Sequence, residues 1–145
     1  MKHETLDALK LRAELLSSSS EIARMSRRER LRRWADVVEQ HSGQLRPFFR
    51  IEYLTPAERR DLRGEDTPLT VAFSDPILRA DGLRSDRLGD GLAYFDIPEH
   101  VGHRLLCDCH YNGAMTNENV ASRLRSLAAG GIVRRLWEWA TGRER

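Results

Sequence analysis

Hydrophobic residues recur at helical spacing along most of this chain, and the clearest case follows Ser26. Ser26 and Glu29 form a capping-box pair, in which the two side chains satisfy unpaired backbone N–H groups at a helix start. The apolar positions that follow lie on one face of the helix, namely Leu31, Trp34, Ala35 and Val38. With Gly43 as a stop signal, the pattern predicts a helix from Ser26 to about Gly43 with that face buried.

Cap and stop signals divide the rest of the chain into further short helices. A leucine stripe predicts a helix over about 3–16, ended by four consecutive serines, which favour caps over helix interiors. Later helices are predicted to start at Thr55, Thr67, Asp75, Asp96 and Thr116. We expect the helix that starts at Asp96 to end before Asn112, and the last helix to run from Ile132 to about Ala140.

Two short segments have some strand character, residues 48–54 and residues 69–73. In the first, Phe49, Ile51 and Tyr53 alternate with charged residues. Two short strands cannot stabilise themselves, so we expect at most minor extended segments packed on helices. The predicted fold is all-α, an irregular bundle of about six to eight short helices. We divide it into a helical extension over 1–25 and a single compact helical domain over 26–141.

Composition agrees with one globular domain, since 40% of the 145 residues are hydrophobic and 32% are charged. The net charge of +2 hides an uneven layout. Residues 21–33 carry six arginines against two glutamates, residues 34–116 carry nine arginines against fourteen acids, and residues 117–145 carry six arginines against three glutamates. This layout favours pairing between basic flanks and an acidic middle within the fold, with a basic face for nucleic acid as the alternative.

The chain shows no sign of secretion or membrane insertion. Its first residues lack the apolar stretch of a signal peptide, and no apolar run reaches the ~20 residues that span a bilayer. Its two cysteines, Cys107 and Cys109, do not form a disulfide framework. We therefore expect a cytoplasmic protein without membrane contact.

Three histidines and a cysteine share one stripe of the helix predicted after Asp96, namely His100, His103, Cys107 and His110. Imidazole and thiolate bind zinc and related metals, so a metal- or redox-responsive role is one hypothesis. On a continuous helix His103 and His110 lie about 10 Å apart along the axis. One ion would then reach only two neighbouring ligands of the stripe. We therefore favour the interpretation that the stripe is a polar helix face without a metal, with Cys109 on the opposite, buried side of the helix.

The turn between Tyr111 and Met115 joins two predicted helices and contains a glycine, Gly113, as in a helix-turn-helix unit. The outward residues of the second helix suit contacts to bases or phosphates, and the candidates are Asn119, Ser122, Arg123 and Arg125. An ordinary helical hairpin gives the same pattern and is favoured. Nucleic-acid binding by a transcriptional regulator is therefore the alternative function.

The last predicted helix combines Arg134 and Arg135 with Trp139, which points away from its apolar face. An outward tryptophan beside arginines is typical of a surface that binds a protein partner. The chain has no phosphate-binding glycine loop, nucleophile elbow or HExxH motif, so we assign no catalytic residue and expect no cofactor. The sequence favours an adaptor or regulator that binds another protein and has no catalytic activity.

Overall fold

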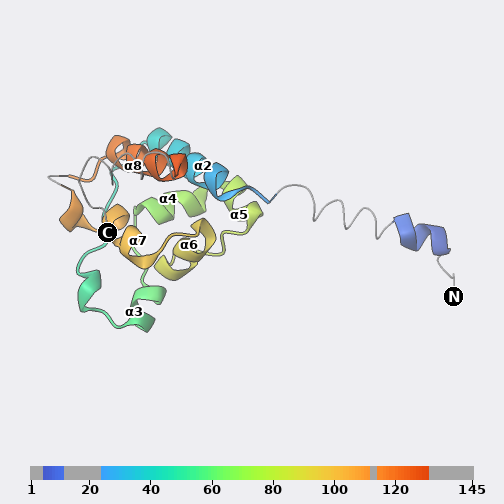
Figure 1. The fold of residues 1–145 in the computed structure, drawn as a ribbon, viewed down its shortest axis with the longest axis horizontal. Helices are drawn as coiled ribbons and strands as arrows, with labels where there is room; N and C mark the ends of the chain where they lie inside the picture. The colour runs from blue at the N-terminus through green and yellow to red at the C-terminus, as the bar shows by residue number, and fades with distance from the viewer. Residues whose placement is uncertain (1–4, 12–23, 112–113, 131–145) are drawn as a thin grey trace, which may run out of the picture.

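The fold of the protein was obtained as a computed structural model that describes residues 5–11, 24–111 and 114–130 (Figure 1). Residues 6–11 are helical. The other elements are α2 (Arg27–Gln40), η1 (Ile51–Tyr53), α3 (Pro56–Asp61), α4 (Pro68–Ser74), α5 (Pro76–Asp81), α6 (Leu88–Phe95), α7 (Glu99–Leu106), η2 (Asp108–His110) and α8 (Asn117–Ala129), where η marks a 3-10 helix. The prediction of an all-α fold of several short helices is confirmed. The predicted division at residue 25 depends partly on residues outside the described ranges.

The longest helix, α2, begins as its sequence predicts. The Ser26 hydroxyl accepts a hydrogen bond from the Glu29 amide at 3.2 Å, and the Glu29 carboxylate accepts one from the Ser26 amide at 2.8 Å. The predicted apolar face is buried, from Leu31 to Val38. This face packs along α8, and the two helices lie side by side at one edge of the molecule (Figure 1).

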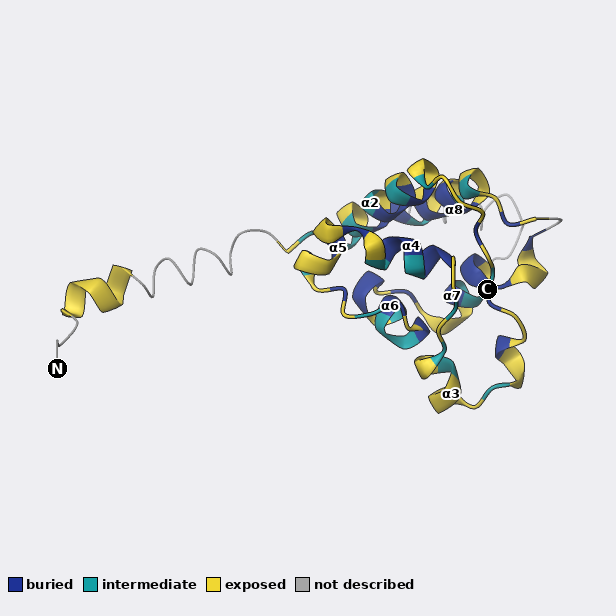
Figure 2. Ribbon diagram, turned by 180° about the vertical axis from the view of Figure 1, so that it is seen from behind, coloured by how far each residue is buried: buried dark blue, intermediate teal, exposed yellow. Residues whose placement is uncertain are grey.

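Trp34 joins three helices at the centre of the core. Its side chain is fully buried and stacks on Phe95 of α6, with the ring centroids 4.1 Å apart. Its indole N–H donates to the Pro68 carbonyl at the start of α4, at 2.8 Å. The helices α4 to α8 carry buried residues on the side of this core, drawn dark blue in Figure 2, whereas α3 has none. A single core therefore lies between the α2–α8 pair and the shorter helices.

Two predictions overlap in this segment: the helix that starts at Thr67 is confirmed, and the possible minor extended segment over 69–73 is wrong, because these residues belong to α4. Thr67 caps this helix by accepting from the Thr70 amide at 3.1 Å, and Pro68 occupies its first turn. A run of apolar residues buried on more than one side has no clear period, so it reads equally as a strand or a buried helix. In this segment Thr67 and Pro68, which start a helix, indicate that the run is helical.

Over 48–54 only Phe48 pairs in the manner of a strand, through an isolated parallel bridge with Cys107. The Phe48 amide donates to the Leu106 carbonyl at 2.8 Å. From Ile51 the chain turns into η1. The described residues therefore contain no β-sheet, and the bridge instead holds the loop before η1 against the end of α7.

Ion pairs join the basic and acidic regions inside the fold, as the charge layout predicts. In α2, Arg33 binds Asp75 through two hydrogen bonds of 2.8 and 3.0 Å, and Arg30 binds Asp81 at 2.8 Å. In α8, Arg125 contacts acidic residues of α2. The hydrogen bonds from Arg33 hold the pKa of Asp75 below its usual range. These contacts neutralise part of the basic charge that the sequence places on the flanks.

Candidate functional site

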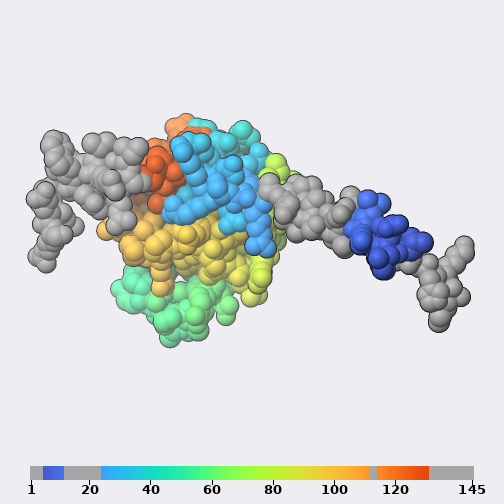
Figure 3. Space-filling view, turned by 45° about the vertical axis from the view of Figure 1, so that its right-hand side comes forward, coloured from blue at the N-terminus to red at the C-terminus, as the bar shows by residue number. Residues whose placement is uncertain are grey.

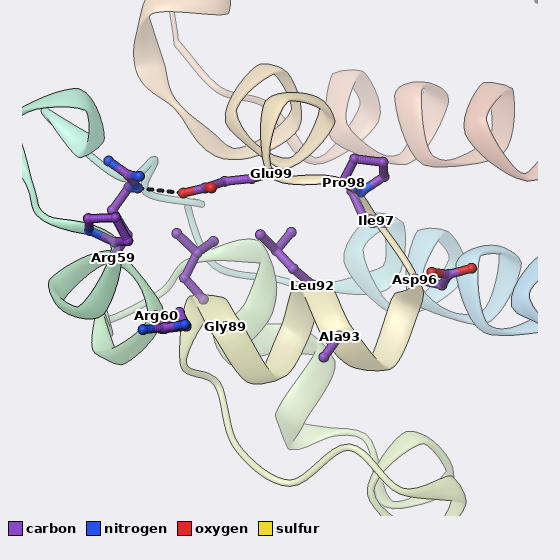
Figure 4. Close-up of a pocket in the computed structure, with 11 residues that line it drawn as sticks. Arg59, Arg60, Gly89, Leu92, Ala93, Asp96, Ile97, Pro98 and Glu99 are labelled. Atoms are coloured by element: carbon purple, nitrogen blue, oxygen red, sulfur yellow. Dashed lines mark hydrogen bonds and ion pairs between the residues drawn. The ribbon is translucent and has the colours of Figure 1, made fainter.

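A groove runs between α3 and α6 and reaches the start of α7 (Figure 4). Its volume is about 420 Å³. Apolar side chains of α6 and the α6–α7 connection form its floor, namely Leu88, Leu92, Ala93, Ile97 and Pro98. Its rim carries opposite charges, with Arg60 on the α3 side and Asp96 on the α6 side. In the space-filling view, α3 forms a green lobe below the yellow and orange surface of α6 and α7 (Figure 3).

A close approach of two backbones fixes the end of the groove. A Cβ atom at Gly89 of α6 would lie 3.0 Å from the backbone oxygen of Arg60 in α3, so a larger residue there would push the α3 backbone away. Next to it, the Leu88 amide donates to the Leu62 carbonyl at 2.9 Å. The short helix α3 is thus anchored by its last turn, while the rest of α3 forms one wall of the groove.

An ion pair divides the groove from a second, smaller pocket. Arg59 donates to the Glu99 carboxylate, and also to the Leu54 carbonyl at 2.8 Å. The smaller pocket has a volume of about 260 Å³ and shares Arg59, Leu88, Leu92 and Glu99 with the groove. Its far side is lined by Glu52, His100 and His103. The groove therefore leads, past the Arg59–Glu99 pair, to the histidines of α7.

The helix predicted to start at Asp96 and to end before Asn112 runs only from Glu99 to Leu106, because Asp96 instead ends α6 in a left-handed conformation. The early end at Leu106 changes the site. Cys107 has an extended backbone, with φ −92° and ψ 142°, because it bridges to Phe48. The chain then continues as η2. The predicted stripe of His100, His103, Cys107 and His110 is therefore wrong. We call residues 99–110 the α7–η2 corner.

Burial of the two cysteines is the reverse of the prediction. Cys107 is buried, with 1% of its surface exposed, and Cys109 is exposed. Burial raises the pKa of the Cys107 thiol to about 12, and this thiol donates to Asp108 at 3.5 Å. Cys107 is therefore a poor ligand and a poor nucleophile, whereas Cys109 faces the solvent.

The same turn brings His103 and His110 together. His110 Nε2 lies 2.8 Å from His103 Nδ1, and the two rings meet edge to face with centroids 4.8 Å apart. Cys109 Sγ lies 4.0 Å from His103 Nε2. Partial loss of hydration and the neighbouring His103 lower the pKa of His110, although its side chain is exposed. We call His103, Cys109 and His110 the His–Cys cluster; His100, one turn earlier on α7, lines the smaller pocket instead.

Of the candidate nucleic-acid residues, Asn119 and Ser122 are exposed on α8, but the two arginines bind within the chain. Arg123 donates to the Arg104 carbonyl at 2.8 Å and to the His110 carbonyl at 2.6 Å. Arg125 contacts Asp36 at 3.1 Å and Glu39 at 2.5 Å. The connection before α8 begins at Cys107 rather than Tyr111, so it is longer than the predicted turn.

Residues 112–113 of that turn, and Arg134, Arg135 and Trp139, lie outside the described ranges. The predicted partner-binding surface of the last helix is therefore not placed. No helix in the described ranges combines the length and apolar character that a membrane crossing needs.

Three features of the site were not predicted from the sequence. Cys109 is placed on the wrong face by the assumption of a continuous helix. Glu52 comes from η1, far away in sequence, and approaches His103 Nε2 to 3.6 Å. The Arg59–Glu99 pair joins residues forty positions apart. No local pattern marks either contact, since both depend on how α3 and η1 fold against α7.

Comparison of the chain with protein-family models, with curated proteins and with solved structures gives no match. Its function is therefore inferred from the groove and from the α7–η2 corner.

Proposed function

We propose that the protein is a binding protein, an adaptor or regulator, that holds a segment of a partner protein in the groove between α3 and α6. The observation that carries this proposal is a groove of about 420 Å³ that has an apolar floor between oppositely charged rims. This volume falls within the roughly 300–1,000 Å³ of typical ligand pockets. The proposal includes no catalytic step.

The charges on the rim favour a peptide segment over a nucleic acid. Arg60 attracts a carboxylate, while Asp96 on the opposite side attracts a basic group and repels phosphate; the charge of Glu99 is already paired with Arg59. We therefore expect a segment with an acidic residue, an apolar side chain for the floor, and a basic residue, in this spatial order. Apolar contact provides affinity, and the two rims fix the direction of the bound segment.

Random peptides displayed on phage and selected against the whole protein test this proposal. We expect selected peptides to carry the acidic, apolar and basic pattern. Ala93→Glu places an unpaired carboxylate on the apolar floor, at an exposed position of α6 where the core is not disturbed. Isothermal titration calorimetry should show that it weakens peptide binding at least about tenfold, because that charge must be desolvated.

Ala57→Glu is the matched control, since Ala57 is also an exposed helical alanine but does not line the groove. It should bind the same peptides within about twofold of the unchanged protein. If selected peptides bind the Ala93 variant as tightly as the Ala57 variant, the groove is not the binding site. Failure to select any peptide that binds in solution contradicts the proposal as well.

Nucleic-acid binding is the second candidate, and Asn119 and Ser122 remain its exposed residues on α8. We rank it second because Arg123 and Arg125 are engaged within the fold. Contacts to phosphates weaken steeply with salt, so a mobility shift of DNA or RNA at low salt tests it. A shift that disappears as salt rises, and that Asn119→Ala reduces, would place this function first.

A further inference from the structure

The His–Cys cluster brings three metal-ligating side chains to one exposed point of the α7–η2 corner. One ligand atom from each of His103, Cys109 and His110 lies within 4.8 Å of the other two. His103 is partly exposed, and Cys109 and His110 are exposed, so an ion can reach all three. The groove described above does not use these three residues as a set.

Two long-range contacts hold this corner in place. The Phe48 amide binds the Leu106 carbonyl at 2.8 Å and ends α7. From α8, Arg123 donates to the carbonyls of Arg104, which follows His103, and of His110, and its guanidinium stacks 3.8 Å from the centre of the Tyr111 ring. The backbone of the ligands is thus fixed before an ion arrives, which lowers the entropy cost of binding.

We propose that His103, Cys109 and His110 bind one divalent transition-metal ion of the zinc class. Two imidazole nitrogens and one thiolate form a borderline-soft donor set, which suits Zn²⁺ and Co²⁺ better than Mg²⁺ or Ca²⁺. The site is independent of the groove proposed for a partner segment.

The distances fit such an ion after small side-chain movements. Zinc bonds of about 2.0 Å to nitrogen and 2.3 Å to sulfur put the ligand atoms of a tetrahedral site roughly 3.3–3.7 Å apart. The cluster atoms lie within 4.8 Å, so shifts of about 1 Å complete the geometry. His103 presents Nδ1 to His110 and Nε2 to Cys109, and the ion takes one of these nitrogens. Rotation of the exposed rings brings the other ligands to it.

The fourth position faces Glu52 of η1. Its carboxylate lies 3.6 Å from His103 Nε2. It can bind the ion directly, or bind a water molecule that occupies the fourth position. Cys109 loses its thiol proton to solvent when the metal–sulfur bond forms, and both imidazoles bind in their neutral form. The Cys109 thiolate and the Glu52 carboxylate together balance the two charges of the ion.

Cys107 belongs to two other groups of nearby ligands, with Glu52 and His103 and with Asp108 and Cys109. It is nevertheless a weaker candidate than Cys109. Its sulfur is buried, with 1% of the residue exposed, and burial raises the pKa of its thiol. Deprotonating it for a metal would leave a charge inside the core.

Cobalt titration of the reduced, full-length protein is the direct test. We expect one equivalent of Co²⁺ to produce a thiolate-to-cobalt charge-transfer band and the intense visible bands of a tetrahedral site. Cys109→Ser should remove the charge-transfer band. Calorimetry with Zn²⁺ should show that Cys109→Ser and His110→Gln each weaken binding at least about tenfold. Both residues are exposed, and circular dichroism checks that each variant is folded.

His100→Gln is the matched control, because His100 is an exposed histidine of α7, the helix that carries His103, and lies outside the cluster. It should bind Zn²⁺ within about twofold of the unchanged protein. The proposal is overturned by absence of saturable binding, by a charge-transfer band that survives in Cys109→Ser, or by equal losses in His100→Gln and His110→Gln. Ala93→Glu should leave Zn²⁺ affinity unchanged, so failure of the groove proposal and failure of the metal proposal are distinguishable.

Discussion

The α2–α8 pair and the α7–η2 corner differ in what holds them together. In the pair, apolar faces meet over several turns and Arg125 joins the helices at the surface. In the corner, α7 buries Leu105 and Leu106, but residues 107–110 after it are held by the bridge from Phe48 and by Arg123 of α8. The pair is therefore stabilised by many redundant contacts, whereas the end of the corner, residues 107–110, depends on a few specific ones.

Because of this difference, we expect global stability and metal binding to depend on different parts of the molecule. Burial of large side chains such as Trp34 supplies most of the favourable free energy of folding. The corner buries Leu105, Leu106 and Cys107 in the same core, but it also carries the exposed or partly exposed side chains of His103, Cys109 and His110. We expect substitutions in the pair to change global stability, and substitutions in the corner to change local structure and metal binding.

The largest expected effect is that of Trp34→Ala. It removes a fully buried ring, its stacking on Phe95 and the hydrogen bond to the Pro68 carbonyl. The free energy of unfolding should fall by about 3–5 kcal/mol in a urea titration. Phe49→Ala is the control, since Phe49 is 61% exposed, and it should change stability by less than about 0.5 kcal/mol. Similar losses in the two variants would remove the distinction between core and surface.

Asp75→Asn should have an intermediate effect. It removes the charge that pairs with Arg33 but keeps an oxygen to cap α5 at the Leu78 amide. We expect a loss of about 2 kcal/mol at neutral pH, typical of a buried hydrogen bond to a charged group.

The pH dependence of this loss follows from the pKa of Asp75, which Arg33 lowers in the folded state. The stabilisation is complete above the unfolded pKa of about 4 and is lost as pH falls through the folded pKa. The stability difference between the unchanged protein and Asp75→Asn should therefore be constant from pH 7 to about pH 5 and shrink in more acidic buffer. A difference that grows on acidification would contradict this account of the ion pair.

Arg123 and Arg125 both belong to α8 but contact different regions, so substituting each one compares the α7–η2 corner with the α2–α8 pair. Arg123→Ala removes both hydrogen bonds to the α7–η2 corner and should cost about 1 kcal/mol. It should also speed amide hydrogen exchange over residues 104–111 and weaken Zn²⁺ binding. Arg125→Ala removes only exposed ion pairs to α2. Its loss of stability should be smaller, should shrink further in high salt, and should leave the corner unchanged. Equal exchange in the two variants would contradict the role of Arg123.

Much of the fold could be predicted because caps and apolar periodicity act locally. The capping box at Ser26, the buried face of α2 and the helix starts at Thr55, Thr67 and Thr116 all depend on residues within a turn or two. The prediction of extended structure over 69–73 failed because this apolar run is buried on more than one side of α4. In that segment burial removes the periodic signal.

The candidate site could be predicted only in part. The histidines and cysteines near residue 107 are visible in the sequence, but their arrangement depends on the bridge from Phe48, almost sixty residues earlier in the chain. Because the bridge ends α7, the residues that follow leave the helical register, and His110 turns back to His103. Contacts of this kind have no local signature, and neither does the approach of Glu52.

Selective alkylation of the native, reduced protein tests the end of α7 most directly. Brief treatment with iodoacetamide, followed by fragmentation mass spectrometry of the peptide that holds both cysteines, identifies which thiol reacts. The exposed Cys109 should be modified first, and the buried Cys107 should react only after unfolding in denaturant. Preferential modification of Cys107 would indicate that the helix continues past Leu106, and the bridge to Phe48 and the His–Cys cluster would then be wrong.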